Sequence, residues 1–459
     1  MTNPVSFKDA FAVWCRVAGQ SFGGPAGQIA VMHRILVDEK KWIDETGFLH
    51  ALSYCMLLPG PEAQQLATYI GWLMHRTRGG LMAGILFVLP GFVTMMVLSI
   101  IYALWQETFF ITALFFGMKP AVVAIIAESL IRIARRVLRS RYSWLIAGCS
   151  FLAVFLFAIP FPFVVAAAAL IGLISERFFP DWFASAQASQ AESSKQAAHS
   201  SQAVPESNPR LELYAPAPTW SRALRVSAVF LTLWWLPILL LAYFAPDDSV
   251  FLKEGLFFSK TAVVTFGGAY AVLAYIAQQA VDNYRWLKPG EMLDGLGMAE
   301  TTPGPLIMVV QFVGFLGAYR NPGNLDPLLA GILGACLTTW VTFVPCFYWI
   351  FLGAPFVERM RRSRTVRGML TSISAAVAGV ILNITLWFAM NTLFSQVQVP
   401  ENGWFRFPVP ILESLSLPAL AMTTIASVIV FWYKRGIGWT LLICCALGIL
   451  FLQAERFLR

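Results

Sequence analysis

The chain has 459 residues, of which 13% are charged and 58% are hydrophobic before its 33 glycines are counted, and its formal net charge is +8. A soluble protein carries roughly 25% charged residues, so most of this chain must lie in hydrocarbon. The sequence therefore predicts an all-α polytopic membrane protein. The positive-inside bias places the excess Lys and Arg in cytoplasmic loops, so no nucleic-acid partner is predicted.

Apolar runs predict about 10 to 13 membrane spans, the first of which is retained as an anchor because the N-terminus lacks a cleavable signal pattern. Two regions, 143–176 and 409–453, are each interpreted as either a true hairpin or a short re-entrant pair. The predicted spans are 7–33, 48–74, 80–105, 109–131, 143–159, 161–176, 224–245, 256–281, 292–318, 327–352, 368–393, 409–432 and 436–453.

A segment of different composition separates two halves. Residues 184–222 are rich in Ala, Ser, Gln and Pro, and such a segment buries too little apolar surface to fold. We therefore predict an N-terminal repeat at 1–183, a disordered cytoplasmic linker at 184–222 and a C-terminal repeat at 223–459.

The two halves resemble each other at an ungapped offset of 244. Phe22-Gly23-Gly24 falls on Phe266-Gly267-Gly268, Trp42 on Trp286, and Pro59-Gly60-Pro61 on Pro303-Gly304-Pro305. Over this 40-residue window 12 positions are identical, where chance gives about two or three, so we infer an internal duplication. Further along, the run 87–90 resembles 342–345 at a larger offset.

Loop charges indicate that the repeats have opposite orientation. In the first half, successive loops hold Arg76 with Arg78, then Glu107, then five arginines between 132 and 141. These charges place the three loops in turn on the cytoplasmic, the outer and the cytoplasmic side. The charges of the matching loops in the second half place them on the outer, the cytoplasmic and the outer side. This is the pattern of an inverted-topology repeat. The apolar run 226–244 supplies the extra crossing, and the protein is predicted in the bacterial inner membrane with its N-terminus and linker cytoplasmic.

Both halves contain a predicted helix break. A Pro-Gly-Pro segment removes two backbone donors and breaks a helix, and unwound backbone is tolerated at membrane depth only where protein or a cavity satisfies it. Half-helices that begin after the breaks would direct free N–H groups inward, which is how helices bind anions. The alternative is that Pro-Gly-Pro merely kinks a helix and Phe-Gly-Gly merely packs against a neighbour.

Two cations match across the repeat. Arg16 and Lys260 each precede the Phe-Gly-Gly motif by six residues, and intramembrane cations are usually functional. With two helix N-termini they would suit a compact dianion. Snorkelling to the membrane interface is the alternative explanation.

Acidic and polar residues beside the breaks complete the predicted site. Glu62 and Glu300 could each carry a proton or cap a half-helix, whereas Glu128 is expected to pair with Arg132. Neither a metal, a cofactor nor a catalytic group is predicted, so the chain is not expected to be an enzyme. The predicted substrate-binding residues are Arg16, Ser21, Phe22, Gly23, Gly24, Pro25, Pro59, Gly60, Pro61, Glu62, Gln65, Lys260, Thr265, Phe266, Gly267, Gly268, Glu300, Thr301, Thr302, Pro303, Gly304 and Pro305.

The motifs at 22–27, 58–63 and 299–305 resemble the paired signatures of the chromate ion transporter (CHR) family in its long, two-domain form. The resemblance covers about 7–176 and 250–453. It implies efflux of chromate from the bacterial cytoplasm, driven by membrane potential or proton motive force, and resistance to chromate. The residues themselves indicate only a small oxyanion, so sulfate stays open as a substrate. An anion channel, a membrane-embedded enzyme and a homodimeric state also stay open.

Overall fold

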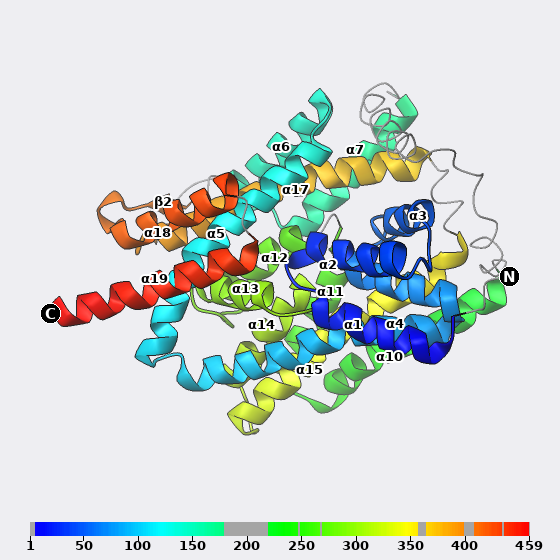
Figure 1. The fold of residues 1–459 in the computed structure, drawn as a ribbon, viewed down its shortest axis with the longest axis horizontal. Coiled ribbons are helices and arrows are strands. Elements are labelled where there is room, and N and C mark those ends of the chain that lie inside the picture. The colour runs from blue at the N-terminus through cyan, green and yellow to red at the C-terminus, as the bar shows by residue number, and fades with distance from the viewer. Residues whose placement is uncertain are drawn as a thin grey trace.

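The computed structural model describes residues 5–178, 219–246, 248–266, 269–356, 364–398, 408–433 and 436–458. Within these ranges the chain is helical apart from loops and one pair of two-residue antiparallel strands, β1 (Val397–Gln398) and β2 (Val409–Pro410). The predicted all-α class is confirmed (Figure 1).

The first half begins with short helices and continues with long ones. The predicted span 7–33 is divided at the Phe-Gly-Gly motif, and the predicted span 48–74 is divided at Pro-Gly-Pro. The helices are α1 (Phe7–Gln20), α2 (Gly24–His33) with a π-helical extension (Arg34–Glu39), α3 (Glu45–Cys55), α4 (Glu62–Trp105), α5 (Phe109–Val137), α6 (Arg141–Phe157) and α7 (Phe161–Phe178).

The second half repeats this order after one additional helix. The helices are α10 (Trp220–Phe244), α11 (Val250–Val264), α12 (Ala269–Gln278) with a π-helical turn (Gln279–Asn283), α13 (Glu291–Thr301), a 3-10 turn (Leu306–Met308), α14 (Val309–Arg320), α15 (Pro327–Gly353) with a 3-10 turn (Ala354–Phe356), α17 (Arg364–Leu393), a 3-10 turn (Leu412–Ser414), α18 (Leu417–Ser427) with a π-helical turn (Val428–Trp432), and α19 (Ile437–Leu458).

Helix α4 reverses direction within its length, as the predicted spans 48–74 and 80–105 require. His75 and Arg76 have non-helical dihedral angles, and Arg76 has a φ of 56°. A Cβ added at Gly71 would lie 2.5 Å from the carbonyl oxygen of Gly79, so the two arms of α4 lie against each other. Small residues permit this close approach of two backbones.

Six described helices are long and apolar enough to cross a bilayer, and four shorter apolar helices accompany them. The number of about 10 to 13 spans stays a prediction. The long helices are Glu62–Trp105, Phe109–Val137, Trp220–Phe244, Pro327–Phe356, Thr365–Leu393 and Ile437–Phe457, and the shorter ones are Arg141–Phe157, Phe161–Ser175, Leu306–Arg320 and Leu417–Trp432.

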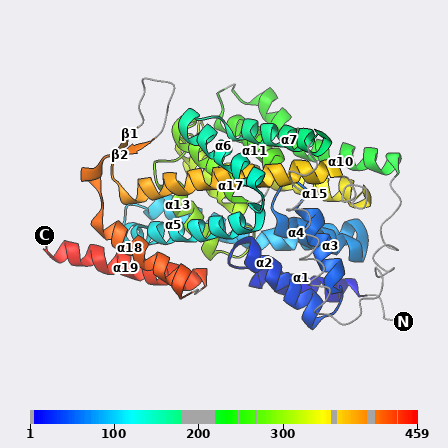
Figure 2. The ribbon, with the colours of Figure 1, turned by 90° about the horizontal axis from the view of Figure 1, so that it is seen from above.

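The two halves are interleaved. Helix α17 of the second half packs on α5, α6 and α7 of the first half, and α19 packs on α5 (Figure 2). Glycines lie at the crossings. A Cβ at Gly172 would meet the carbonyl oxygen of Gly368 at 2.5 Å, and Gly448 would meet the backbone nitrogen of Gly117 at 2.6 Å. The linker region therefore joins two halves that share one core.

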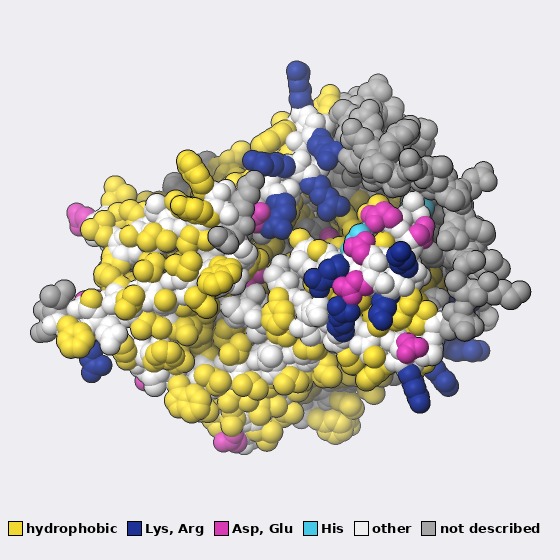
Figure 3. All heavy atoms as spheres, in the orientation of Figure 1, with side chains coloured by type: hydrophobic (Ala, Val, Ile, Leu, Met, Phe, Trp, Pro, Cys, Tyr) yellow, Lys and Arg dark blue, Asp and Glu magenta, His cyan; other side chains and the backbone are white. Residues whose placement is uncertain are grey.

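The surface divides into an apolar and a basic region. In Figure 3 hydrophobic side chains cover much of the face over α15 and α19, whereas Lys and Arg gather on the side of α2 and α6. The apolar part of this face fits contact with lipid, and the basic part fits contact with water.

One predicted boundary changes. Helix α10 begins at Trp220, so the last residues of the predicted linker 184–222 are already helical. The apolar run 226–244 provides most of this helix, and helix formation extends toward its N-terminus beyond the apolar residues. The greater part of the predicted linker lies outside the described residues, and its disorder stays a prediction.

Candidate functional site

Each Pro-Gly-Pro break is bonded to the opposite half of the chain. The backbone N–H of Gly60 donates to the carbonyl oxygen of Thr265 at 2.7 Å, and the N–H of Gly304 donates to the carbonyl oxygen of Ser21 at 2.9 Å. Both donor and both acceptor positions are related by the offset of 244. The two bonds are therefore equivalent under the repeat. The break of each half contacts the Phe-Gly-Gly region of the other half.

The local sequence explains why the glycine makes this bond. Proline has no backbone N–H, so the glycine is the sole backbone donor of each Pro-Gly-Pro segment. Gly60 has a φ of 128° and Gly304 a φ of 102°, and residues with a Cβ avoid this region. The motif thus supplies both the required turn and a backbone donor that bonds to the opposite half.

The breaks also pack against matching residues of the two long helices. A Cβ at Gly304 would lie 3.2 Å from Cα of Gly91, and one at Gly60 would lie 2.9 Å from Sγ of Cys346. Gly91 and Cys346 follow Pro90 and Pro345, the prolines of the second, looser sequence match. The first-half break therefore lies against α15, and the second-half break lies against α4.

Helices begin directly beside these contacts. Helix α4 begins at Glu62 after Pro61, and α2 begins at Gly24 after Gly23, whose φ is 82°. The predicted half-helix after 59–61 is observed. In the second half, the three-residue 3-10 turn separates Pro305 from α14. The start of α4 has no side-chain cap, so the capping hypothesis for the Glu62 carboxylate is not supported.

Glu300 reaches from the second half to the Phe-Gly-Gly region of the first half. Its side chain is buried, and Oε1 accepts a hydrogen bond from the hydroxyl of Tyr270 at 2.5 Å. Its Oε2 has no hydrogen-bond partner in the described part of the chain and lies 3.6 Å from the position of a Cβ at Gly24. Glu300 therefore lies at the junction of both halves, where the sequence predicted a site residue.

Glutamine amides satisfy the backbone carbonyls that the breaks expose. Nε2 of Gln65 donates to the oxygen of Pro59 at 2.7 Å, and Nε2 of Gln28 donates to the oxygen of Gly304. Because an unpaired buried carbonyl is costly, these amides stabilise the unwound backbone. Gln65 was predicted to contact substrate, and its observed bond is to the break itself.

Four predicted hydroxyl donors are bonded within their own helices. Ser21 donates to Val17 at 2.6 Å and Thr265 donates to Thr261 at 2.5 Å, again at the offset of 244. The hydroxyls of Thr301 and Thr302 donate to the oxygens of Met298 and Ala299. In this conformation these hydrogens are engaged by the protein, so the expected direct donation to an oxyanion requires a rotamer change.

The two predicted cations have different surroundings. Arg16 pairs with Glu39 at 2.7 Å and its side chain is 44% exposed, whereas Nζ of Lys260 lies 6.0 Å from the ring centre of Tyr275. Across the described part of the chain, neither side chain donates a hydrogen bond to a Pro-Gly-Pro segment. Their role in binding stays a prediction.

The remaining predicted residues are the two motif aromatics, Pro25 and the second glycine pair. Phe22 is 47% exposed, Phe266 is half-buried, and Pro25 follows the first residue of α2. Gly267 and Gly268 lie outside the described residues.

Sequence reasoning missed four residues of the site: Tyr270, Gln28, Gly91 and Cys346. Gly91 and Cys346 carried a usable signal, because each follows a proline that the looser repeat match aligns. Tyr270 and Gln28 carried no such signal, because the residues that match them at the offset of 244 are Ala26 and Val272, which are of a different type.

Interleaved halves with reciprocally bonded breaks define a multi-pass membrane protein built from two related repeats. The chain belongs to the chromate transporter family, whose model matches residues 8–173 and 252–449. The two matched regions correspond to the two halves.

Curated relatives match most of the chain. It is 26% identical to a chromate transport protein of Cupriavidus metallidurans over 82% of this chain and 81% of the relative. It is 29% identical to a chromate transport protein of Pseudomonas aeruginosa over 85% of this chain and 82% of the relative. It is 27% identical to a probable chromate transport protein of Synechococcus elongatus over 82% of this chain and 84% of the relative. No solved structure matches the chain.

Proposed function

We propose that this protein carries chromate out of the bacterial cytoplasm across the inner membrane and so confers chromate resistance. Membership of the chromate transporter family and the names of the relatives support the substrate. The observation that carries the carrier mechanism is the reciprocal bond between each glycine of a break and the opposite half.

In the proposed mechanism the two breaks and the two Phe-Gly-Gly regions form one midplane site. The starts of α2 and α4 beside the breaks offer N–H groups and positive dipole ends to a dianion. Because each break is held by the other half, a rocking of one repeat against the other changes which side of the site is open. Arg16 and Lys260, outside the site contacts, raise the local concentration of the anion through their charge.

The proposed orientation places the N-terminus and the linker in the cytoplasm, with repeats at 1–183 and 223–459 in opposite orientation. Figures 1 and 2 draw the end of α19 and the start of α1 toward opposite ends of the long axis, which fits an odd number of crossings. The gathering of Lys and Arg on the side of α2 also supports this orientation.

Membrane potential is sufficient to drive export. A dianion that leaves an inside-negative cell gains about 4.6 kcal/mol per 100 mV, since each charge contributes about 2.3 kcal/mol. This corresponds to more than about a thousandfold in concentration, at 1.4 kcal/mol for each factor of ten.

The test uses everted membrane vesicles from cells that express the protein and from cells with an empty vector. We expect labelled chromate to accumulate when an inside-positive potential is imposed, and excess unlabelled sulfate to leave most of this uptake intact. Uptake equal to that of the empty control would contradict transport, and complete inhibition by sulfate would assign a broader oxyanion substrate. Counterflow of labelled chromate against unlabelled internal chromate separates a carrier from a channel.

A further inference from the structure

A second polar feature lies in the second half, apart from the breaks. Glu254 of α11 is fully buried, and among the described residues neither of its carboxyl oxygens has a hydrogen-bond partner. Two glycines of the neighbouring helices make room for it. A Cβ at Gly317 of α14 would lie 2.6 Å from Oε1, and a Cβ at Gly334 of α15 would lie 3.0 Å from Oε2.

No cation balances this carboxyl within the described part of the chain. Lys253 bonds to Asp248, which lowers the pKa of that exposed carboxyl, and Arg320 of α14 bonds to both oxygens of Glu291 at 2.7 Å. On the elements packed against α11, the other charged residues are Arg222 and Arg225 at the start of α10, and α12 and α15 carry none. The segment 284–286, which packs on Phe257 of α11, adds Arg285 and the titratable Tyr284. Lys260 of α11 itself lies beside Tyr275. The remaining titratable side chains of these elements are Tyr243, Tyr270, Tyr275, Tyr319, Cys336, Cys346 and Tyr348.

An ionised carboxylate without a partner is unstable in such a place, so the conformation described here requires a bound proton on Glu254. Ionisation would demand water or a cation between α11, α14 and α15. Gly317 and Gly334 bring the backbones of α14 and α15 close to this carboxyl, so water or a cation that reaches it has to enter between these three helices. Loss of the proton is therefore coupled to separation of these helices.

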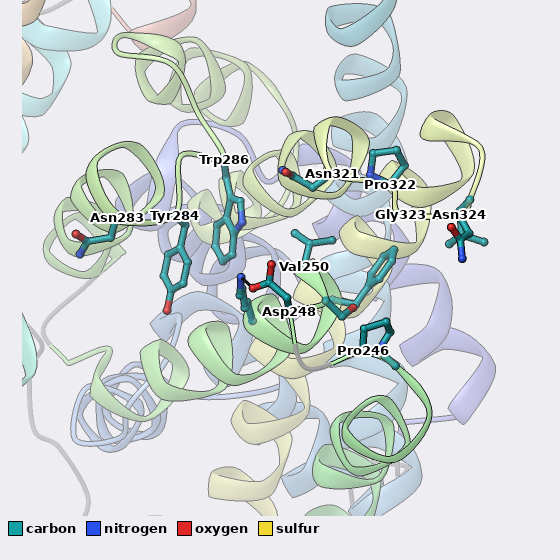
Figure 4. Close-up of a pocket in the computed structure, with 15 residues that line it drawn as sticks. Pro246, Asp248, Val250, Asn283, Tyr284, Trp286, Asn321, Pro322, Gly323 and Asn324 are labelled. Carbon is teal, nitrogen blue, oxygen red and sulfur yellow. Dashed lines mark hydrogen bonds and ion pairs between the residues drawn. The ribbon is translucent and has the colours of Figure 1, made fainter.

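A cavity gives the proton a path. A pocket of about 640 Å³ is lined by residues that include Val250, Lys253, Tyr284 and Trp286 (Figure 4). The ring of Trp286 stacks on Tyr284 with 4.3 Å between ring centres. Its Cγ lies 3.0 Å from the same Cβ position at Gly317 that Oε1 of Glu254 approaches. Trp286 thus borders both the cavity and the buried carboxyl. In the orientation proposed above, this cavity opens on the outer side.

Helix α11 connects this carboxyl to the break. It begins at Val250, contains Glu254 and is followed by Thr265, whose carbonyl oxygen accepts the bond from Gly60. The eleven-residue separation corresponds to about 16 Å along a helix. A shift of α11 at Glu254 therefore acts directly on one of the two bonds that hold the breaks.

We propose that Glu254 is a proton-binding site, reached from the outer cavity past Trp286, and that its protonation and release couple proton entry to anion export through α11. This rests on the proposed function and adds the coupling ion to it. The reaction at the site is reversible protonation of one carboxylate by one proton, with no other reactant.

The experiment measures chromate flux in proteoliposomes at zero membrane potential, clamped with potassium and valinomycin, at alkaline pH where chromate stays fully deprotonated. We expect a pH difference of one unit to shift the wild-type chromate distribution by about tenfold for each coupled proton. Glu254→Gln should lose this response and keep chromate counterflow, which needs no net proton movement. Glu254→Asp should keep part of the response. The exposed Glu413→Gln is the matched control and should behave as the wild type.

Infrared spectroscopy tests the bound proton without transport. The purified wild-type protein should show the C=O stretch of a buried protonated carboxylic acid that Glu254→Gln lacks and Glu413→Gln retains. A wild type that carries chromate under a potential without responding to the pH difference would overturn the coupling alone. An unchanged response or an unchanged infrared band in Glu254→Gln would also overturn it. A wild type without chromate flux under any gradient would overturn the proposed function as well.

Discussion

The two halves of the chain share their breaks and differ in their acids. Ser21 and Thr265 accept equivalent bonds from Gly304 and Gly60, but Glu300 and Glu254 of the second half fall opposite Met56 and Ala10 of the first. The duplicated part is backbone geometry, which a symmetric pair of breaks needs on both sides. The unduplicated part is the pair of buried carboxyls, Glu300 and Glu254.

This difference indicates that the second half contributes acidic side chains to the site that the first half lacks at the matching positions. The carboxyl of Glu300 reaches into the Phe-Gly-Gly region of the first half, with its Oε2 3.6 Å from a Cβ placed at Gly24. The matching position of the first half is Met56, so no acidic side chain makes the equivalent contact with the second half. Comparing matched variants in the two halves therefore separates what symmetry requires from what one half supplies.

The largest effect is expected at the break glycines. Gly304→Ala forces a Cβ into a region that costs about 1–3 kcal/mol in backbone strain, and it places that Cβ 3.2 Å from the backbone of Gly91. We expect chromate transport to fall by more than about tenfold, since 1.4 kcal/mol corresponds to a factor of ten.

Gly60→Ala is the matched variant in the first half. Its Cβ would lie 2.8 Å from Nε2 of Gln65 and 2.9 Å from Sγ of Cys346, which are side-chain atoms that can move. We expect a smaller loss than for Gly304→Ala, measured as initial uptake rate per inserted protein. Equal activity of both variants and the wild type would contradict the role of the breaks.

The Glu300 carboxyl gives the next effect. Tyr270→Phe removes the hydroxyl that donates to Oε1 at 2.5 Å, and an unsatisfied buried group costs about 1–3 kcal/mol. We expect a lower midpoint in thermal unfolding and slower transport. Tyr243→Phe, at an 81% exposed tyrosine, should change neither, and an equally stable Tyr270→Phe would refute the contribution of this bond.

Gln28 has no counterpart in the second half, where Val272 takes its place. Gln28→Leu removes the amide that donates to the carbonyl oxygen of Gly304, and such a bond contributes about 1 kcal/mol. We expect about a fivefold slower chromate uptake. Gln20→Leu is the control because the exposed side chain of Gln20 bonds only to Arg34 among the described residues. If both variants slow transport equally, the bond to Gly304 is not the cause.

The smallest effect is expected at the two matched cations. Arg16 is in an exposed ion pair with Glu39, and such pairs contribute up to about 1 kcal/mol. We expect Arg16→Gln and Lys260→Gln each to leave thermal stability nearly unchanged and to raise the half-saturating chromate concentration by about twofold, because exposed charges are screened by salt. Complete loss of transport in both would instead place the cations directly on the anion.

Composition, hydropathy and motif spacing determined the all-α membrane class, the two halves and the positions at which helices break. These are local consequences of the chain, because apolar length sets the spans and proline removes backbone donors wherever it stands. The glycines at 60 and 304 were identifiable for the same reason.

Only the tertiary structure decided what each break contacts. The bond from Gly60 to Thr265 joins residues about two hundred positions apart, and no local pattern encodes which carbonyl a free N–H meets. The same holds for Glu254, whose sequence neighbours suggest an ordinary residue near a helix start. Its burial between Gly317 and Gly334 depends on how three helices pack, and packing is a property of the whole fold.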